Sequence, residues 1–524
     1  MTIFPSLYPE VAQSDLSISE RLFQGLETRP DDVAIIDGPT GRHMTAAGLM
    51  DQIRALAGGL TARGSAPGRT IAILAPNCPE YAVVFHGVAF AGGTITTLNP
   101  TYTAPEIQHQ LQDAGAVMVI TIPALADLAR AGMADTPAEE LVVIGGGGEG
   151  ALSLDDLMGP AQAAQSPVGL DSFPVVLPYS SGTTGRPKGV MLSHRNIVTN
   201  VNQLALPTEL QPGETVIAFL PFFHIYGMTV LMNLILGEKG RLVTMPRFDL
   251  EQFLQLIQTH GVNRLYIVPP VALALAKHPM VDQYDMSSVR YIFSGAAPLG
   301  AEVEEAVGQR LQAESIQGYG MTEMSPVSHS TYKGKPRHGS SGQAVPGTEC
   351  RIVEPESGAD LGPDEEGELW VRGPQVMMGY LNNPEATAAT LTKDGWLKTG
   401  DLAVIDGQGY MFIRDRLKEL IKYKGFQVAP AEVEAALIAH DQVIDAAVVG
   451  KPDDEAGELP IAFVVSAPGA GIGQADMRTH LQGCLAHYKH PVEFRFVDSV
   501  PKSASGKILR RFLRDELRAE GVKS

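Results

Sequence analysis

The chain has 524 residues, 44% of them hydrophobic and 19% charged, which is typical of a soluble globular protein with more than one domain. Its formal net charge of −19 argues against a nucleic-acid-binding surface, which needs a basic face. The sequence has no apolar run of about 18 residues, so we expect no membrane span.

Cysteine usage and the N-terminus indicate the compartment. Cys78, Cys350 and Cys484 lie far apart and lack metal-ligand spacing, so we interpret them as reduced thiols. The first residues lack a basic stretch followed by an apolar one, so the sequence predicts no signal peptide. Both features favour a cytoplasmic protein.

The first third of the chain alternates short β-like runs with helical ones. Residues 71–74 and 94–97 are predicted strands on either side of a helix at 79–91, and strands at 117–122 and 141–144 continue the series. Strands separated by helices of this length are typical of parallel α/β layers.

Residues 179–189 read Tyr-Ser-Ser-Gly-Thr-Thr-Gly-Arg-Pro-Lys-Gly between two apolar runs. Glycines let a backbone turn its N–H groups toward an anion, and the hydroxyls and Lys188 add donors and a positive charge. The segment therefore predicts a polyphosphate cradle. It is not a Walker A loop, because Gly189 and an apolar run follow the lysine instead of Ser/Thr and a helix.

Strands are predicted again at 215–220, 265–268 and 291–294, and a helix at 302–311. Around 367–373 the pattern becomes more purely β, which indicates a small barrel or sheet.

A domain boundary is predicted between residues 415 and 416. After it, strand, helix, strand, strand, helix and strand follow within about 105 residues, enough for a small independent α+β domain. We therefore predict domains at 1–415 and 416–524.

Three further segments carry side chains suited to a nucleotide site. His224 lies among aromatic residues that suit a pocket wall, although a lone histidine there is more often packing. Tyr319 can stack on a purine, and Glu323 nearby suits Mg²⁺ beside phosphates, although this segment could equally be a plain strand-to-turn connection. Asp401 follows a glycine turn and could accept protons from two ribose hydroxyls, or simply cap the turn.

Two lysine-rich segments lie near the C-terminus, at 416–427 and 501–507. Either one by itself would be interpreted as a solvated charged face.

The glycine-rich loop and these five segments, in this order, resemble the adenylate-forming superfamily of acyl-CoA synthetases, luciferases and peptide-synthetase adenylation domains. The chain is most similar to the 4-coumarate–CoA ligases, which share Ser-Ser-Gly-Thr-Thr-Gly-x-Pro-Lys-Gly, His-Ile-Tyr and Lys-Glu-Leu-Ile-Lys-Tyr-Lys-Gly-Phe-Gln-Val-Ala-Pro. Two positions depart from those ligases. Val230 stands where some have serine, and Arg247 stands where plant enzymes have a lysine that contacts coenzyme A.

The resemblance implies an α/β fold: a large N-terminal domain of layered sheets with a small β-barrel, and a mobile α+β C-terminal lid hinged near Lys418. It implies two half-reactions. A carboxylate first attacks the α-phosphate of ATP and expels pyrophosphate, and the thiol of coenzyme A then displaces AMP from the acyl-adenylate. The expected ligands are a small carboxylic acid, ATP, Mg²⁺ and coenzyme A.

Residue roles also follow from the resemblance. It assigns the phosphates to Ser180, Ser181, Gly182, Thr183, Thr184 and Lys188, and Mg²⁺ to Thr184 and Glu323. It assigns the adenylate to Ala296, Gln317, Gly318, Tyr319 and Thr322, and the ribose to Asp401 and Arg416. The first half-reaction is assigned to Lys507, the second to Lys418, Lys422 and Gln427, and coenzyme A to Arg247, Lys424 and Gly425. His224 is a further catalytic candidate, and the acyl group is expected against Tyr226, Val230, Ala296 and Gly318.

Several alternatives stay open at this point. A medium- or long-chain fatty acyl-CoA ligase is the principal one for the acid, and a luciferase-type oxygenase shares the core motifs. A peptide-synthetase adenylation domain is disfavoured because no carrier domain follows Lys507. A nucleotide-binding regulator without catalysis is disfavoured by the presence of Lys507, Lys422 and Glu323.

Overall fold

The structure is a computed structural model that describes residues 2–148, 150–180, 187–424, 426–453, 455–503 and 506–521. Five predicted site residues, Ser181, Gly182, Thr183, Thr184 and Gly425, lie outside these ranges.

An eight-stranded sheet forms the first α/β layer, in the order β20-β10-β9-β5-β4-β6-β7-β8. Its strands are β4 (Thr70–Leu74), β5 (Thr94–Thr97), β6 (Ala116–Thr121), β7 (Glu140–Val143), β8 (Leu152–Ser153), β9 (Pro174–Ser180), β10 (Lys188–Ser193) and β20 (Gly379–Tyr380). The strands from β9 to β8 run parallel, whereas β10 and β20 are antiparallel additions at one edge.

Both faces of this sheet are buried. Ile71 and Ile73 of β4 belong to the main core with α2 (Ala46–Ala62) and α3 (Pro79–Phe90), whereas Ala72 and Leu74 pack with α4 (Ala104–Ala114) and α5 (Ala126–Met133). Successive side chains of a strand point to opposite faces, so helices on both sides require an apolar residue at every position. Burial of both faces therefore explains why residues 71–74 of β4 are all apolar.

A nine-stranded sheet forms the second layer, in the order β17-β16-β15-β14-β13-β11-β12-β2-β3. Its strands are β2 (Val33–Asp37), β3 (His43–Thr45), β11 (Thr215–Ala218), β12 (Arg241–Thr244), β13 (Arg264–Ile267), β14 (Tyr291–Ser294), β15 (Glu314–Gly320), β16 (Val327–Ser330) and β17 (Gln343–Ala344). The strands from β2 to β15 are parallel. The main core contains residues of both sheets and of α3 between them, and α3 is buried on almost every side.

Further helices flank the second layer: α1 (Ile18–Leu26), α6 (His194–Thr208), α7 (Leu250–His260), α8 (Pro269–Lys277) and α9 (Ala301–Leu311). Several begin with side-chain caps. Ser193 accepts a hydrogen bond from the backbone of Asn196 at the start of α6, for example, which satisfies one of the free N–H groups of the first turn.

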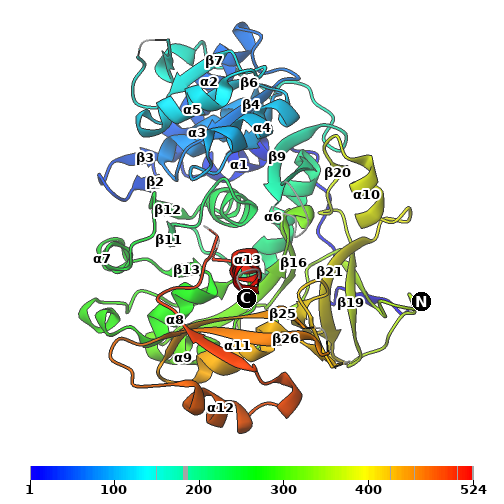
Figure 1. The fold of residues 1–524 in the computed structure, drawn as a ribbon. Helices are drawn as coiled ribbons and strands as arrows, with labels where there is room; N and C mark the ends of the chain where they lie inside the picture. The colour runs from blue at the N-terminus through cyan, green and yellow to red at the C-terminus, as the bar shows by residue number, and fades with distance from the viewer. Residues whose placement is uncertain are drawn as a thin grey trace.

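A third sheet is antiparallel and has five strands, β1-β18-β19-β21-β22. They are β1 (Phe4–Pro5), β18 (Glu349–Val353), β19 (Glu366–Arg372), β21 (Leu397–Ile405) and β22 (Met411–Arg416). The N-terminal segment reaches this sheet because β1 pairs with β18 (Figure 1). The short helix α10 (Pro384–Thr390) follows β20.

Residues after β22 form their own sheet and two cores. The strands are β23 (Ile421–Tyr423), β24 (Phe426–Val428), β25 (Val443–Asp453), β26 (Gly457–Ser466) and β27 (Glu493–Phe496), and the helices are α11 (Pro430–Ala439), α12 (Gln474–Gln482) and α13 (Arg510–Gly521). One core contains α11 and α12, and the other contains Leu513 and Leu517 of α13. The orange elements α11, α12, β25 and β26 lie by α8 and α9, at the end of the molecule opposite α2–α5, whereas the red helix α13 is drawn nearer the middle (Figure 1).

The predicted α/β fold class is confirmed, with the third sheet as its smaller β unit. Sequence reasoning missed α13. The apolar run at 446–449 predicts a strand of only four residues for β25, whereas the strand extends over Val443–Asp453. Gly450 and Pro452 interrupt the apolar run, but both residues pair in register with β26, so tertiary pairing overrides the local pattern.

Candidate functional site

The predicted phosphate loop joins two paired strands. Ser180 at the end of β9 pairs with Lys188 at the start of β10. A strand rather than a helix follows Lys188, in agreement with the exclusion of a Walker A loop. The Lys188 ammonium lies 4.7 Å from the centre of the Tyr380 ring, so an aromatic face holds this cation beside the loop.

A buried carboxylate lies next to this hairpin. Glu323 belongs to the short helix η5 (Thr322–Met324), and its Oε1 accepts hydrogen bonds from the Ser180 hydroxyl at 3.1 Å and the Tyr380 hydroxyl at 2.8 Å. Burial and the charge of Glu323 raise the pKa of Tyr380 above its usual range, so Tyr380 stays a donor. The described residues contain no cluster of three or more metal-ligating side chains. A single carboxylate beside the predicted phosphate loop nevertheless fits Mg²⁺, which commonly takes one or two protein carboxylates and fills its shell with phosphate and water oxygens.

The far end of β15 meets the third sheet at a second polar cluster. The Tyr319 hydroxyl donates to Asp401 Oδ2 at 2.6 Å, and Arg416 Nε lies 3.2 Å from Asp401 Oδ1. Asp401 on β21 and Arg416 on β22 are paired in register, so the sheet itself fixes the ion pair. Burial and the nearby Asp401 raise the pKa of Tyr319 well above its usual range.

Two backbone features shape the wall next to this cluster. Ala296 has φ of +70°, which residues other than glycine, asparagine and aspartate rarely adopt, so its backbone is strained. Gly318 lies so close to its neighbours that a Cβ there would come within 2.5 Å of the Phe293 ring and 2.9 Å of the His329 carbonyl oxygen. Only glycine fits at that point of β15.

Lys507 reaches this cluster from the C-terminal sheet. Burial and the nearby Arg416 charge lower its pKa to about 8, although Asp401 and Glu419 oppose the shift. Its neighbour Gly506, with φ of +80°, packs against Val268, which lies 3.1 Å from where a Cβ of that glycine would be. The loop that carries Lys507 is therefore seated on the N-terminal part of the chain.

A cleft of about 1020 Å³ connects these groups between the N-terminal sheets and the C-terminal sheet. Its lining includes Ala296, Gln317, Gly318, Tyr319, Asp401, Arg416, Gln427 and Lys507. The structure thus brings together most of the residues predicted for the adenylate and the ribose.

Four predicted residues within the described ranges, Lys418, Lys422, Lys424 and Arg247, are exposed and lie outside the lining of this cleft. Lys422 lies opposite Gln427 in the hairpin of β23 and β24, and Arg247 lies between β12 and α7. Of the two lysines proposed to act on the α-phosphate, Lys507 therefore lines the cleft in this structure and Lys422 does not.

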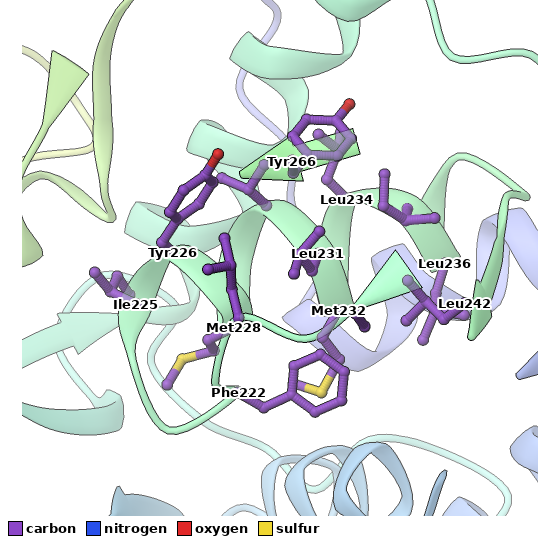
Figure 2. Packing of buried hydrophobic residues seen from close by; sticks show 14 of the residues in the cluster. Phe222, Ile225, Tyr226, Met228, Leu231, Met232, Leu234, Leu236, Leu242 and Tyr266 are labelled. Atoms are coloured by element: carbon purple, nitrogen blue, oxygen red, sulfur yellow. The ribbon is translucent and has the colours of Figure 1, made fainter. Parts of the chain in front are cut away.

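Two of the four predicted acyl-pocket residues, Tyr226 and Val230, lie on a π-helix, η3 (Tyr226–Ile235), whereas Ala296 and Gly318 line the cleft. Figure 2 shows Tyr226 and Tyr266 on the side of this helix opposite Phe222 and Met232. The Tyr226 hydroxyl lies 3.4 Å from the carbonyl oxygens of both Ile267 and Phe293, and Val230 is only 1% exposed. The segment has the wider turn of a π-helix, in which residues four apart, such as Tyr226 and Val230, lie nearly one turn apart.

His224 precedes this helix. Its Nδ1 accepts a hydrogen bond from the backbone N–H of Tyr226 at 3.3 Å, and with Thr322 it lines a second, smaller pocket of about 30 Å³. Burial and the charge of Lys507 lower the pKa of His224 to about 4. The imidazole is therefore neutral near pH 7.

Known proteins are similar to this chain over nearly its whole length. The family described as AMP-binding enzyme matches residues 22–381, and the one described as AMP-binding enzyme C-terminal domain matches residues 432–507. The chain belongs to the AMP-binding enzyme family. This confirms the predicted resemblance and that the protein is an enzyme.

Individual relatives of this AMP-binding enzyme are similar along their full length. A 4-coumarate–CoA ligase 5 from Oryza sativa subsp. japonica is 42% identical over 530 residues, covering 99% of this chain and 98% of the relative. The structure of an anthranilate CoA ligase, AuaEII, in complex with anthranoyl-AMP superposes with a TM-score of 0.91 at 27% identity, covering 98% of this chain and all of the other. ATP-bound MatB from Rhodopseudomonas palustris superposes with a TM-score of 0.86 at 32% identity, over 95% of this chain and 98% of the other.

Sequence reasoning missed two residues of the site of this AMP-binding enzyme. Tyr380 connects Lys188 and Glu323, yet nothing in its local sequence distinguishes it from a packing tyrosine. Glu304 on α9 is 1% exposed and accepts from the Gln317 amide at 2.7 Å and from the backbone of Gly339 at 3.0 Å. An acidic residue in the first turn of a helix is ordinary, so only the fold shows that Glu304 holds Gln317.

None of the described helices is long and apolar enough to cross a membrane.

Proposed function

We propose that this enzyme joins a carboxylic acid to coenzyme A through an acyl-adenylate, with release of pyrophosphate and AMP, and that its acid is of the cinnamate or 4-coumarate type. The observation that supports the reaction most directly is the cleft in which Lys507 shares a lining with Gly318, Tyr319 and the Asp401–Arg416 pair. The names of the similar ligases support the same reaction.

In the first half-reaction, the backbone and hydroxyls of 180–184, together with Lys188, hold the phosphates of ATP. Asp401 and Arg416 hold the ribose, and the adenine lies along Ala296, Gln317 and Tyr319. Lys507 neutralises charge on the carboxylate and the α-phosphate, because in-line phosphoryl transfer needs positioning and charge compensation more than covalent help. His224 would form part of the wall of the acyl pocket. Because it is neutral at pH 7, it adds no second positive charge to that of Lys507.

Glu323 and Thr184 would hold Mg²⁺. That ion supplies charge neutralisation on the phosphate oxygens. The hydroxyls of Ser180 and Tyr380 fix the orientation of the Glu323 carboxylate independently of the ion.

The second half-reaction needs a different face of the C-terminal segment. Lys422 and Gln427 lie on one hairpin, of which Gln427 lines the cleft and Lys422 does not, whereas Lys507 lies on a separate loop that lines the cleft. We propose that residues 416–524 rotate as a lid about Lys418, as in other hinge closures, so that the hairpin replaces Lys507. Arg247, Lys424 and Gly425 would then contact coenzyme A.

The acid is proposed from the tyrosine on η3. In this proposal an aromatic ring packs against Tyr226, and the Tyr226 hydroxyl exchanges its long 3.4 Å hydrogen bonds to the Ile267 and Phe293 carbonyl oxygens for one to a phenol. Val230 offers no hydrogen bond to a 4-hydroxyl group, so plain cinnamate should compete with 4-coumarate. A fatty acyl-CoA ligase is the alternative, and solved relatives that include an anthranilate CoA ligase indicate how far acids vary in this family.

A panel of acids tests the proposal. Cinnamate, 4-coumarate, benzoate, octanoate and palmitate are each incubated with ATP, Mg²⁺ and coenzyme A, and pyrophosphate and thioester are measured. We expect the highest kcat/KM for the two cinnamates, at comparable values. A preference for octanoate or longer acids would refute the proposed acid, and failure to release pyrophosphate with every acid would refute the reaction.

A further inference from the structure

Helix α11 begins without a capping residue of its own. Its N-cap position is Ala429, which has no side-chain acceptor, and Pro430 at the first helical position has no N–H. The first N–H that needs an acceptor belongs to Ala431, and it donates to Asp415 Oδ2 at 2.8 Å. The cap therefore comes from a residue sixteen positions earlier in the chain.

Asp415 and Ala431 lie on opposite sides of the proposed hinge at Lys418. Asp415 belongs to β22 of the third sheet, whereas α11 belongs to the C-terminal sheet and its cores. The carboxylate is 5% exposed, so little water competes for it in this arrangement. A rotation about Lys418 would separate the two partners.

The other end of α11 is held in the same way. Lys277, the last residue of α8, donates from Nζ to the carbonyl oxygens of Ile438 at 3.1 Å and His440 at 3.4 Å. These carbonyls end α11, where a helix carries partial negative charge. An anion at the N-terminus and a cation at the C-terminus, both preceding the hinge, thus clamp one helix of the C-terminal segment.

The position of α11 is transmitted to Lys507 by a buried ion pair. Glu434 on α11 accepts two hydrogen bonds from the Arg510 guanidinium, at 2.8 and 2.7 Å. Arg510 is the first residue of α13 and follows Lys507 by three positions. The side chains of both are less than 14% exposed, so the pair joins helix and loop rigidly.

We propose that Asp415 and Lys277 are positioning residues for adenylate formation, which hold α11 in the orientation that places Lys507 in the cleft. This inference rests on the proposed roles of Lys507 and the hinge. In the rotated arrangement that serves thioester formation, both contacts are broken. The clamp thereby sets the balance between the two half-reactions.

The expected effect follows from a two-state equilibrium. If adenylation proceeds only from the present arrangement and thioester formation only from the rotated one, the ratio of the two rates changes by the same factor as the equilibrium between them. A hydrogen bond to a buried charged group corresponds to a change of about tenfold or more. An exposed cation at a helix C-terminus corresponds to about two- to fivefold.

The test measures both half-reactions of the full chain separately. Adenylation is followed as acid-dependent ATP–pyrophosphate exchange, and thioester formation is followed from a synthetic acyl-adenylate and coenzyme A. We expect Asp415→Ala to raise the ratio of thioester to adenylation rates about tenfold and Lys277→Met to raise it about threefold. Asp415→Asn, whose amide oxygen can still accept from Ala431, and Lys277→Arg, which keeps the charge, should lie nearer the wild type.

Matched controls separate this role from general stability. Thr45 caps α2 by accepting from the backbone of Gly48 at 3.1 Å, so Thr45→Ala removes a cap of the same kind within the first layer. Lys393→Met removes an exposed lysine elsewhere on the surface. Both should leave the ratio unchanged, even if Tm falls.

The outcomes distinguish this inference from the proposed function. Unchanged adenylation in Lys507→Ala would refute the proposed role of that lysine and the clamp with it. A normal loss of adenylation in Lys507→Ala, combined with an unchanged ratio in Asp415→Ala and Lys277→Met, would overturn the clamp alone. Should Asp415→Ala fail to fold, Lys277→Met compared with Lys277→Arg still decides the question, and an equal ratio in the two variants would overturn the clamp.

Discussion

The lowered pKa of Lys507 gives a prediction that can be worked out from the structure. Burial and Arg416 lower its pKa from the ordinary 10.5 to about 8. For a lysine the charged form is the protonated one, so the charge is complete well below pH 8 and is lost as pH rises through that value. At pH 9 about nine-tenths of the Lys507 side chains would be neutral, whereas an ordinary lysine would stay about 97% charged.

If the ammonium neutralises charge in the first half-reaction, kcat/KM for ATP should fall about tenfold between pH 7 and pH 9. This ratio reports the free enzyme, in which no bound phosphate raises the pKa again. Thioester formation from a supplied acyl-adenylate should not share this decline. Its rate should instead rise, because the attacking thiol ionises with a pKa of about 8.5.

The assay is the pH profile of acid-dependent pyrophosphate release, measured in parallel for the wild type and for Lys507→Arg. Arginine keeps its charge throughout this range, so the variant should retain whatever activity its geometry allows without the alkaline decline. A decline at the same pH in Lys507→Arg would show that another group titrates. A flat wild-type profile up to pH 9 would refute the proposed role of the Lys507 charge.

Three further changes test the division of labour and the acid. Lys422→Ala should still release pyrophosphate but transfer the acyl group to coenzyme A at least tenfold more slowly, because it loses one contact of a charged group. Equal loss of rate in both half-reactions would contradict a rotating lid. Lys418→Pro fixes φ near −65° at the hinge, so only one half-reaction should survive when the two are assayed separately. Val230→Ser should raise the ratio of kcat/KM for 4-coumarate to kcat/KM for cinnamate about tenfold, because a buried hydroxyl without a partner costs about 1–3 kcal/mol. An unchanged ratio would show that the 4-hydroxyl group of the substrate does not face Val230.

The sequence was sufficient for features that depend on local chemistry. The order of Ser, Thr, Gly and Lys around Lys188 excludes a Walker A loop because the residues after the lysine read as a strand, and β10 is a strand. The short apolar runs of β4 and its neighbours predicted strands of parallel α/β layers, and the structure has β4 as a strand that contributes to two cores. The order of the motifs was also enough to recognise the family, because each motif can be identified from its own residues without knowing where the fold places it.

Tertiary structure decided everything that depends on contacts between distant segments. Nothing around Tyr380 or Glu304 distinguishes them in the sequence, because their roles come from partners 57 and 13 positions away. Both lysine-rich segments read alike as charged loops, and only the packing of Gly506 on Val268 shows which lysine occupies the cleft. The cap of α11 is the clearest case. Local sequence leaves Ala431 without an acceptor, and Asp415 supplies one only when the two segments fold against each other, because a hydrogen bond depends on distance in space rather than along the chain.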